Sequence, residues 1–504
     1  MRHPMPAIGL AVTCLIWGGS ARAEAPLSII DWLGTEERSG PQSAPPVTET
    51  AVQPQIEVQP LDRSAPPIGL VPPSVTGLPV TLWQNSMPEM LTRLIETAPV
   101  TGHAPLQSLL YSMLLTEAIP PGGPEGAQAL TLARIDRLLD LGAIDPAKAL
   151  IEQAGPTRSP ALMTRWADMA FLSGSEGEVC ATLAQRPHLA PDRETLIFCT
   201  ARRGDLNAAT LLFDISLVLD DLDPRIAPAL DRFLHPELFE DAAPLSQPRA
   251  PRPLTFRLFE AIGERVPTAS LPRRFAVADL RDVAGWKAQL EAAERLARTG
   301  AIPSNTLLGL YTERLPAASG GVWERVAAIQ RFETALQTRS ADAVTKTLTE
   351  AWDHMERAGL LVPLADLFAT QLAEIGLTQG EPQRRALEMA LLSPEYEALS
   401  RRYTPQAPLD RFLVALAQGT PEAAPAPSAL AETIVAGFSA PPDLPRGLSA
   451  DRLGETILRA MVLFNRGAEG NLRDLRDAIG VFRALGLEDV ARRASLHLMI
   501  REEG

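Results

Sequence analysis

The stretch LTLARIDRLLDLGAIDPAKAL at residues 130–150 holds a complete helix–turn–helix pattern. Ile135, Leu138 and Leu139 recur at the three- and four-residue spacing of a buried helix face. Gly142 ends this run, and a glycine in the left-handed conformation closes a helix while the next apolar residue tucks back onto its last turn. A second apolar run starts directly afterwards. The stretch therefore predicts two helices joined by a short turn.

The same glycine turn recurs along the chain at Leu141–Asp145, Arg203–Leu206, Thr299–Ile302 and Leu485–Glu488. Helix, glycine turn and helix form the unit of tetratricopeptide-like solenoids, although the spacing here is irregular and the consensus of about 34 residues is absent. Strand and hairpin signals are scarce. The predicted fold is all-α, with irregular antiparallel helical-hairpin repeats of a TPR-like α-solenoid. A set of ordinary helical domains is the alternative.

Three pairs of a capping residue and a proline predict helix starts: Asp145-Pro146, Ser159-Pro160 and Ser393-Pro394. The short side chain accepts a hydrogen bond from the first turn, and proline suits the first helical position because that position needs no backbone donor.

The chain begins with the pattern of a secretory signal peptide, residues 1–23. An arginine precedes the apolar run Ala7–Trp17, and the small residues of Ala21–Ala23 favour cleavage before Glu24. The run is too short for a membrane span of about 20 residues, so we expect no stable membrane insertion after cleavage. A lipid anchor at Cys14 is disfavoured by the residue that precedes it.

Composition indicates an exported bacterial protein. Of 47 basic residues only Lys148, Lys287 and Lys346 are lysine, and this arginine bias, with abundant alanine, is typical of a GC-rich genome. A Gram-negative periplasm is the simplest location. The net charge of −14 and the pI of about 5.1 argue against nucleic acid and anionic membrane as partners, because binding phosphate needs clustered cations.

Proline-rich stretches divide the mature chain. Residues 24–80 form a predicted disordered arm, with an apolar docking island at 27–33 that offers Ile29, Ile30, Trp32 and Leu33 to a partner or to the chain's own groove. The remaining predicted parts are an N-terminal helical-repeat region at 81–240, a linker at 241–253, a central helical region at 254–419, a Pro/Ala-rich segment with a short helix at 420–448, and C-terminal helices at 449–504.

Cys180 and Cys199 remain after processing, an even count for an oxidising compartment. Each falls on one arm of a predicted helical hairpin, residues 175–184 and 192–202. We expect a disulfide, with two buried thiols as the alternative.

Catalytic and metal-binding motifs are missing from the sequence. None of the six histidines has zinc-ligand spacing, and nucleophile and phosphate-binding motifs are absent. The acidic turn with Asp220, Asp221 and Asp223 lacks the spaced ligands of a calcium loop, so we expect a solvated loop. We therefore expect no cofactor, no metal and no catalysis.

One segment, Leu310–Trp323, has the composition of a surface site. The amides of its small-residue loop precede a predicted helix start, where anions and peptide carboxylates bind. Aromatic residues and a lysine would flank such a ligand. The alternative is that the small residues let two helices pack closely around a core tryptophan. The candidate partner-binding residues are Trp286, Lys287, Tyr311, Ser319, Gly320, Gly321 and Trp323.

The leader and proline-rich arm, Cys180 with Phe198-Cys199, Gly285-Trp286-Lys287 and Leu310–Trp323 together resemble an uncharacterised family of exported helical-repeat proteins from GC-rich Gram-negative bacteria. Its members are sometimes mislabelled as antifreeze-glycopeptide-like, because their Ala/Pro/Thr-rich arms match by composition. The resemblance covers most of the chain and implies fold and compartment, without an activity.

These patterns favour a periplasmic scaffold that binds protein or peptide partners of the cell envelope. The first alternative is a peptidoglycan-active enzyme or its regulator. A lytic transglycosylase would need a catalytic Glu-Ser in a glycine- and aromatic-rich context, whereas this chain has Glu455-Thr456 in an amphipathic helix. The second alternative is a periplasmic protein that binds a small ligand in a pocket between helices.

Overall fold

A computed structural model describes residues 66–503 apart from 378–379 and 442–443. Within this part of the chain the regular secondary structure consists of α-helices and short 3-10 turns, which confirms the all-α prediction there. The predicted signal peptide, residues 1–23, and the island, 27–33, lie outside the described residues.

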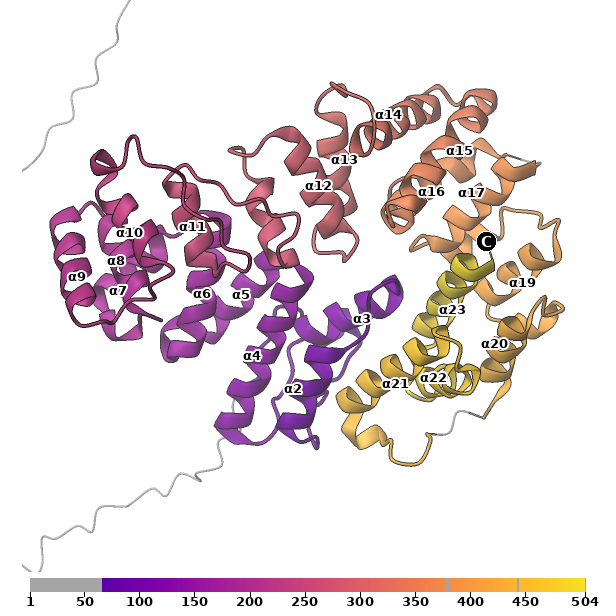
Figure 1. Ribbon diagram of the computed structural model, residues 1–504. Helices are drawn as coiled ribbons and strands as arrows, with labels where there is room; N and C mark the ends of the chain where they lie inside the picture. The colour runs from indigo at the N-terminus through magenta and orange to yellow at the C-terminus, as the bar shows by residue number, and fades with distance from the viewer. Residues whose placement is uncertain (1–65, 378–379, 442–443, 504) are drawn as a thin grey trace, which may run out of the picture. The chain divides into compact units, whose positions relative to one another are not determined.

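The first helices pack against their neighbours in sequence, as α4 does on α5 and α8 on α9 (Figure 1). The helices of this part are α1 (Pro73–Thr76), α2 (Pro88–Thr97), α3 (Ala104–Leu115), α4 (Gly123–Leu141), α5 (Ile144–Ala154), α6 (Pro160–Ser173), α7 (Gly177–Gln185), α8 (Arg193–Arg202), α9 (Leu206–Val218), α10 (Ala227–Leu234) and α11 (Pro253–Ala261).

The later helices follow the same rule. In α15 the side chains of Val344, Leu348, Ala351 and Met355 are buried at helical spacing, and this stripe seats the helix on its neighbours. The helices of this part are α12 (Trp286–Ala297), α13 (Ser304–Thr312), α14 (Val322–Thr338), α15 (Ala341–Arg357), α16 (Leu361–Ile375), α17 (Gly380–Leu392), α18 (Tyr396–Ser400), α19 (Pro408–Ala417), α20 (Ala429–Ser439), α21 (Leu453–Ala468), α22 (Leu472–Ala484) and α23 (Glu488–Glu503).

All four predicted glycine turns have the expected backbone. Each glycine has a positive φ, and the next residue donates its N–H to a carbonyl in the last turn of the helix before it. The φ values are 87° at Gly142, 93° at Gly204, 62° at Gly300 and 76° at Gly486. The hydrogen bonds are Ala143 to Leu138 at 2.8 Å, Asp205 to Thr200 at 3.3 Å, Ala301 to Leu296 at 3.1 Å and Leu487 to Phe482 at 2.8 Å.

The predicted helix starts are only partly correct. Ser159 caps α6 by accepting a hydrogen bond from the Leu162 N–H at 3.3 Å. Asp145 instead lies inside the first turn of α5, because the turn at Gly142 closes α4 so tightly that α5 begins at Ile144. Ser393 precedes no helix start either: its hydroxyl donates to the carbonyl of Ala390, and the next helix begins at Tyr396.

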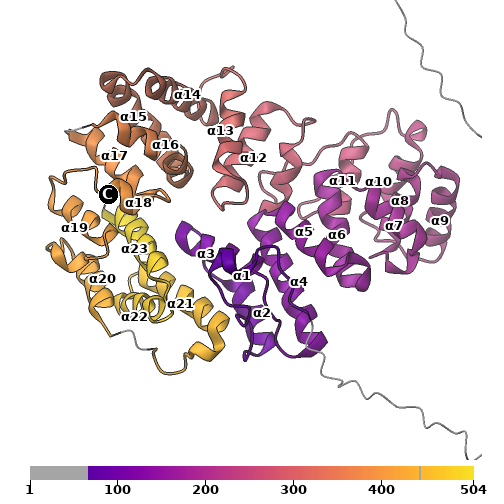
Figure 2. The same ribbon diagram turned by 180° about the vertical axis from the view of Figure 1, so that it is seen from behind.

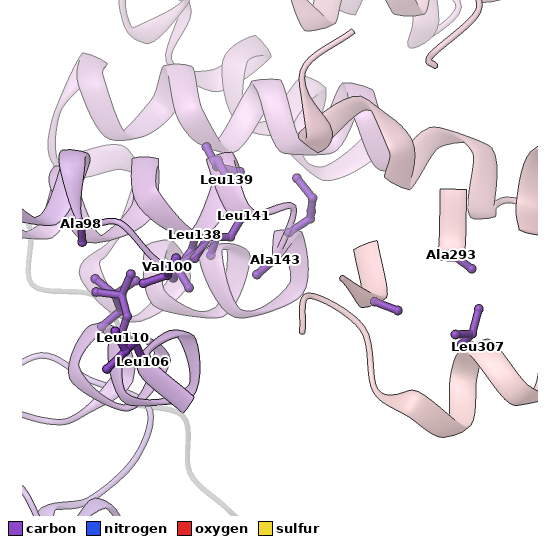
Figure 3. Close-up of a cluster of buried hydrophobic side chains, with 14 of the residues drawn as sticks. Ala98, Val100, Leu106, Leu110, Leu138, Leu139, Leu141, Ala143, Ala293 and Leu307 are labelled. Atoms are coloured by element: carbon purple, nitrogen blue, oxygen red, sulfur yellow. The ribbon is translucent and has the colours of Figure 1, made fainter. Parts of the chain in front are cut away.

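The core joins the helices of different parts. Figure 3 shows apolar side chains of α3 and α4, among them Leu106, Leu110 and Leu138, packed together, with Ala293 of α12 beside Leu307 of α13. All five side chains are almost completely buried. Burying one leucine contributes about 1.5–3 kcal/mol, so this layer contributes substantially to stability.

The first and last helices of the described chain pack on one another. α23 lies against α3, and α2 lies against α21 (Figure 2). The residues that the structure describes accordingly belong to one compact unit. The predicted linker at 241–253 and the segment at 420–448 both fall inside this unit, and the second contains the short helix expected there, α20.

The folded part begins earlier than residue 81, where the sequence analysis ends the arm. Ile68 and Val71 form isolated β-bridges with the segment after α3, and α1 follows. The buried Arg134 side chain donates hydrogen bonds to the carbonyls of Leu114 at 2.7 Å, Ile68 at 2.9 Å and Thr116 at 3.1 Å. One arginine therefore ties the start of the folded chain to α3 and α4, a role that composition does not reveal.

Candidate functional site

A cavity of about 540 Å³ lies between helices from the beginning, middle and end of the described chain. Its wall comprises the start of α3, the α12–α13 turn, the α15–α16 turn, the end of α17 with the residues that follow it, and the last turns of α23. Leu361, Val362 and Ile500 supply part of the apolar lining. Small-molecule sites have volumes of about 300–1,000 Å³, so this cavity is large enough for a ligand of several residues.

His103 forms part of the wall at the residue before α3. Its ring packs edge-on against Phe464 with centroids 5.5 Å apart, and its side chain hydrogen-bonds Asn465. Burial, followed by the charge of Arg501, lowers the pKa of His103 to about 4. The imidazole is therefore neutral at neutral pH.

His497 faces the same cavity from α23. It is 7% exposed, and the backbone of Leu392 holds one side of its ring. Burial, then Arg493 and His103, lowers its pKa to about 3. In the part of the chain that the structure describes, its Nε2 atom is buried without a hydrogen-bond partner. Such a group is uncommon in folded proteins and calls for a partner.

Three arginines line the cavity, and two of them already have a carboxylate partner: Arg501 pairs with Glu502 at 3.0 Å and Arg298 pairs with Glu294 at 3.5 Å. Arg501 donates to the carbonyl of Gly102 at 3.3 Å, which anchors the end of α23 to the residue before His103. Arg298 donates to the carbonyl of Ala358 at 2.5 Å. Arg493 is less occupied: its ion pair with Asp489 is 3.9 Å long, and its buried Nε has no partner among the described residues.

Two carboxylates give another part of the wall the opposite charge. Glu356 lies at the end of α15 and Asp366 on α16, and both are exposed. Neither has an ion-pair partner within the described segments of the chain. The cavity wall therefore carries both signs of charge: α23 contributes two arginines, the α15–α16 pair contributes two carboxylates, and Arg298 from the end of α12 lies beside the α15–α16 turn.

The structure places the predicted aromatic residues mainly in the core. Tyr311 is 1% exposed, and its hydroxyl donates to Glu294 at 2.8 Å. Trp286 donates to the carbonyl of Leu310 at 3.0 Å and packs on Trp323 with centroids 5.1 Å apart. The two tryptophans are therefore in contact with each other, and Trp286 and Tyr311 have intramolecular hydrogen-bond partners.

The remaining predicted residues of this segment lie at the surface. Lys287 is exposed and pairs with Glu291 at 3.7 Å. Ser319, Gly320 and Gly321 form an exposed loop directly before α14. The residues that line the cavity include none of this predicted set.

Cys180 in α7 and Cys199 in α8 are joined, with their sulfur atoms 2.03 Å apart. Both side chains are buried. The structure thus pairs the two cysteines that the sequence analysis paired.

Other acidic residues already have partners. Asp221 pairs with Arg193 at 2.9 Å, and Asp223 pairs with Arg225 at 2.8 Å. The buried Glu455 of α21 pairs with Arg459 at 2.9 Å. No cluster of three or more metal-ligating side chains occurs among the residues that the structure describes.

The cavity could not be predicted from the sequence because its wall combines five segments that are far apart in the chain. The available signals were weak: an Arg-rich last helix with one histidine in its apolar face, and a His-Ala-Pro helix start at His103. Neither signal predicts that α3 and α23 meet.

Comparisons with protein-family models, curated proteins and solved structures find no match. No described helix has both the length and the apolar composition needed to cross a lipid bilayer.

Proposed function

We propose that this protein is a non-catalytic binding protein of the cell envelope that holds a short peptide in its cavity. The observation that carries the proposal is the presence of both cationic and anionic side chains on the cavity wall. Arg493 and Arg501 lie on α23, and Glu356 and Asp366 lie on α15 and α16. A ligand with a free carboxylate and a free amine, as short peptides have, is complementary to this arrangement.

The chemistry of each contact follows from the groups present. Guanidinium groups bind carboxylates through paired, charge-assisted hydrogen bonds, while an ammonium group pairs with carboxylates. Since burial keeps His103 and His497 neutral at neutral pH, the cationic side depends on the arginines.

The architecture supports the same proposal. The four glycine turns share one backbone geometry, and successive helices pack on one another. We assign them as degenerate repeats of a TPR-like solenoid, an architecture that binds peptides on its inner surface. The leader-like N-terminus and the paired cysteines favour a periplasmic location.

Calorimetric titration tests the proposal. The mature protein is titrated with a tripeptide in three forms: free, N-acetylated and C-amidated. We expect the free form to bind and each blocked form to lose at least about tenfold in affinity, since a charge-assisted hydrogen bond is worth about 1.5–3 kcal/mol. Equal affinity for all three forms, or no binding, contradicts it.

Variants locate the binding. Arg501→Gln should lower the affinity for the free peptide about as much as C-amidation of the peptide does. Asp366→Asn should lower it about as much as N-acetylation does. Arg331→Gln, at an arginine paired with Glu350 outside the cavity lining, is the matched control. A tripeptide of the cell-wall stem and an ordinary L-tripeptide distinguish a wall fragment from the end of a partner protein as the source.

A further inference from the structure

The outer face of α9 is apolar and uncovered. Leu211, Ile215, Val218 and Leu219 are 60%, 46%, 86% and 65% exposed. Their spacing places them on one side of the helix and its C-terminal end. We call these four residues the α9 stripe.

The α9 stripe differs from the other exposed apolar residues. Leu217, on another side of α9, is 48% exposed. Val75, Met87, Val283 and Leu315 are also exposed, but they occur singly on separate elements. Isolated exposed apolar residues are normal, whereas a contiguous patch marks an interaction surface. Only Ala209, Phe213 and Ser216 of α9 are buried, so the helix uses one narrow face for its own fold. In addition Leu206, expected to tuck into the preceding turn, is 52% exposed.

Opposite charges flank the two ends of α9. Arg203 lies just before the helix and Asp220 just after it, and both are exposed. The N-cap residue Asp205 is also exposed, and its carboxylate accepts a hydrogen bond from the Ala208 N–H at 3.1 Å. In the described part of the chain neither Arg203 nor Asp220 has an ion-pair partner, whereas the adjacent Arg202 and Asp221 do. The helix dipole adds positive charge at the first end and negative charge at the second.

We propose that the α9 stripe is a self-association surface whose occupant is a second copy of this chain, with the two α9 helices antiparallel about a two-fold axis. A two-fold contact must be self-complementary. Antiparallel pairing meets this condition, because each Arg203 approaches the other copy's Asp220 while the apolar stripes cover one another. The dipoles are then also antiparallel. A different partner protein would not require the two ends of α9 to carry complementary charges, whereas a second copy of α9 does.

A single helix face buries less than the roughly 1,200 Å² of a stable protein interface. We therefore expect a weak, reversible dimer in the micromolar range. The inference rests on α9 alone and is independent of the proposed peptide cavity.

Sedimentation velocity of the mature full-length protein, from about 1 to about 300 μM, tests this proposal. We expect a concentration-dependent dimer that Leu211→Asp weakens at least tenfold. Leu315→Asp, at an 82% exposed leucine on another element, should leave the dimer unchanged. Both sites are exposed, so neither variant disturbs the core. A monomer throughout the range, or a dimer that Leu211→Asp leaves intact, overturns the proposal.

A charge-reversal cycle tests the orientation. Arg203→Glu and Asp220→Arg should each weaken the dimer, and the double variant should restore it, since every contact then carries reversed charges. Asp220 has φ of 54°, and Arg339 has the same φ in this chain, so arginine is accommodated there. No restoration overturns the antiparallel pairing. The alternative occupant is the chain's own N-terminal arm. If the protein is a monomer, and removal of residues 24–65 makes the amides of α9 exchange faster with solvent, the arm covers α9 and self-association is overturned.

Discussion

At the scale of single residues, the buried Arg134 connects three backbone carbonyls through one side chain. It is 1% exposed, and burial lowers its pKa to about 10. Arg134→Met would leave the carbonyls of Ile68, Leu114 and Thr116 without their donor. An unsatisfied buried acceptor costs about 1–3 kcal/mol, so we expect urea unfolding to show a loss of at least about 3 kcal/mol. Arg93→Met, on the exposed side of α2, should change stability by less than about 0.5 kcal/mol. Equal effects of the two substitutions would contradict this role.

Tyr311 separates a packing role from a ligand role. Its hydroxyl and the guanidinium of Arg325 both bind Glu294, at 2.8 Å and 2.6–2.7 Å, and burial raises the pKa of Tyr311 well above its usual value. We expect Tyr311→Phe to lower the free energy of unfolding by about 1.5–3 kcal/mol, because a hydrogen bond to a charged group is lost. Thermal unfolding with and without peptide measures this. A variant with unchanged stability but weaker peptide binding would favour the ligand role.

The sequence predicts both helices of this network but not the network itself. Apolar periodicity places Tyr311 at the end of one helix and Glu294 in the helix before it. The phenol meets the carboxylate only when the helices of Tyr311, Glu294 and Arg325 pack together. Such a contact depends on three elements together, and one sequence carries no signal for it.

At the scale of elements, local signals predict much more. The predicted arms at 175–184 and 192–202 correspond to α7, Gly177–Gln185, and α8, Arg193–Arg202. Asp192 caps α8 by accepting a hydrogen bond from the Thr195 N–H at 2.8 Å. Caps and short turns involve neighbouring residues, so the sequence contains the information. Asp145 is not a cap because the turn at Gly142, a neighbouring local signal, makes α5 begin at Ile144.

The α7–α8 hairpin carries the disulfide prediction. Closing a loop of about 20 residues contributes about 3 kcal/mol in the chain-entropy view. We expect the variant with Cys180→Ala and Cys199→Ala to lose about that much stability. The unreduced mature protein should have a mass about two daltons below the reduced form. Two freely alkylated thiols in protein taken from the periplasm would contradict the pairing.

At the scale of the whole molecule, prediction from sequence ends. The contact of α23 with α3 joins residues nearly four hundred positions apart, as the hydrogen bond from Arg501 to Gly102 does. Helical periodicity says which face of each helix is buried but not which helix covers it. The cavity exists only because of that contact, so its histidines, arginines and carboxylates belong to no motif.

The same contact makes stability depend on pH through His103 and His497. Their folded pKa values of about 4 and 3 lie below the ordinary 6.5, so the unfolded chain binds protons more tightly. The stability they contribute is complete above pH 6.5 and is lost as pH falls towards 4. In this range each histidine should lower the free energy of unfolding by about 1.4 kcal/mol for every pH unit of acidification. Burial raises the pKa of Asp168 to about 6, which acts in the opposite direction below pH 6.

Urea unfolding between pH 7 and 5 isolates the two histidines. The groups that act on them are Arg501, Glu469 and Glu502 for His103, and Arg493 for His497. These groups and Asp168 remain in the variant with His103→Gln and His497→Gln. Comparing the slope of unfolding free energy against pH between this variant and the wild type therefore removes their contribution. We expect that variant to lose less stability on acidification than the wild type, by about 3 kcal/mol between pH 6.5 and 5. His188→Gln, at an exposed histidine, should keep the wild-type slope. Equal slopes in all three proteins would mean that the α3–α23 contact does not hold its histidines neutral.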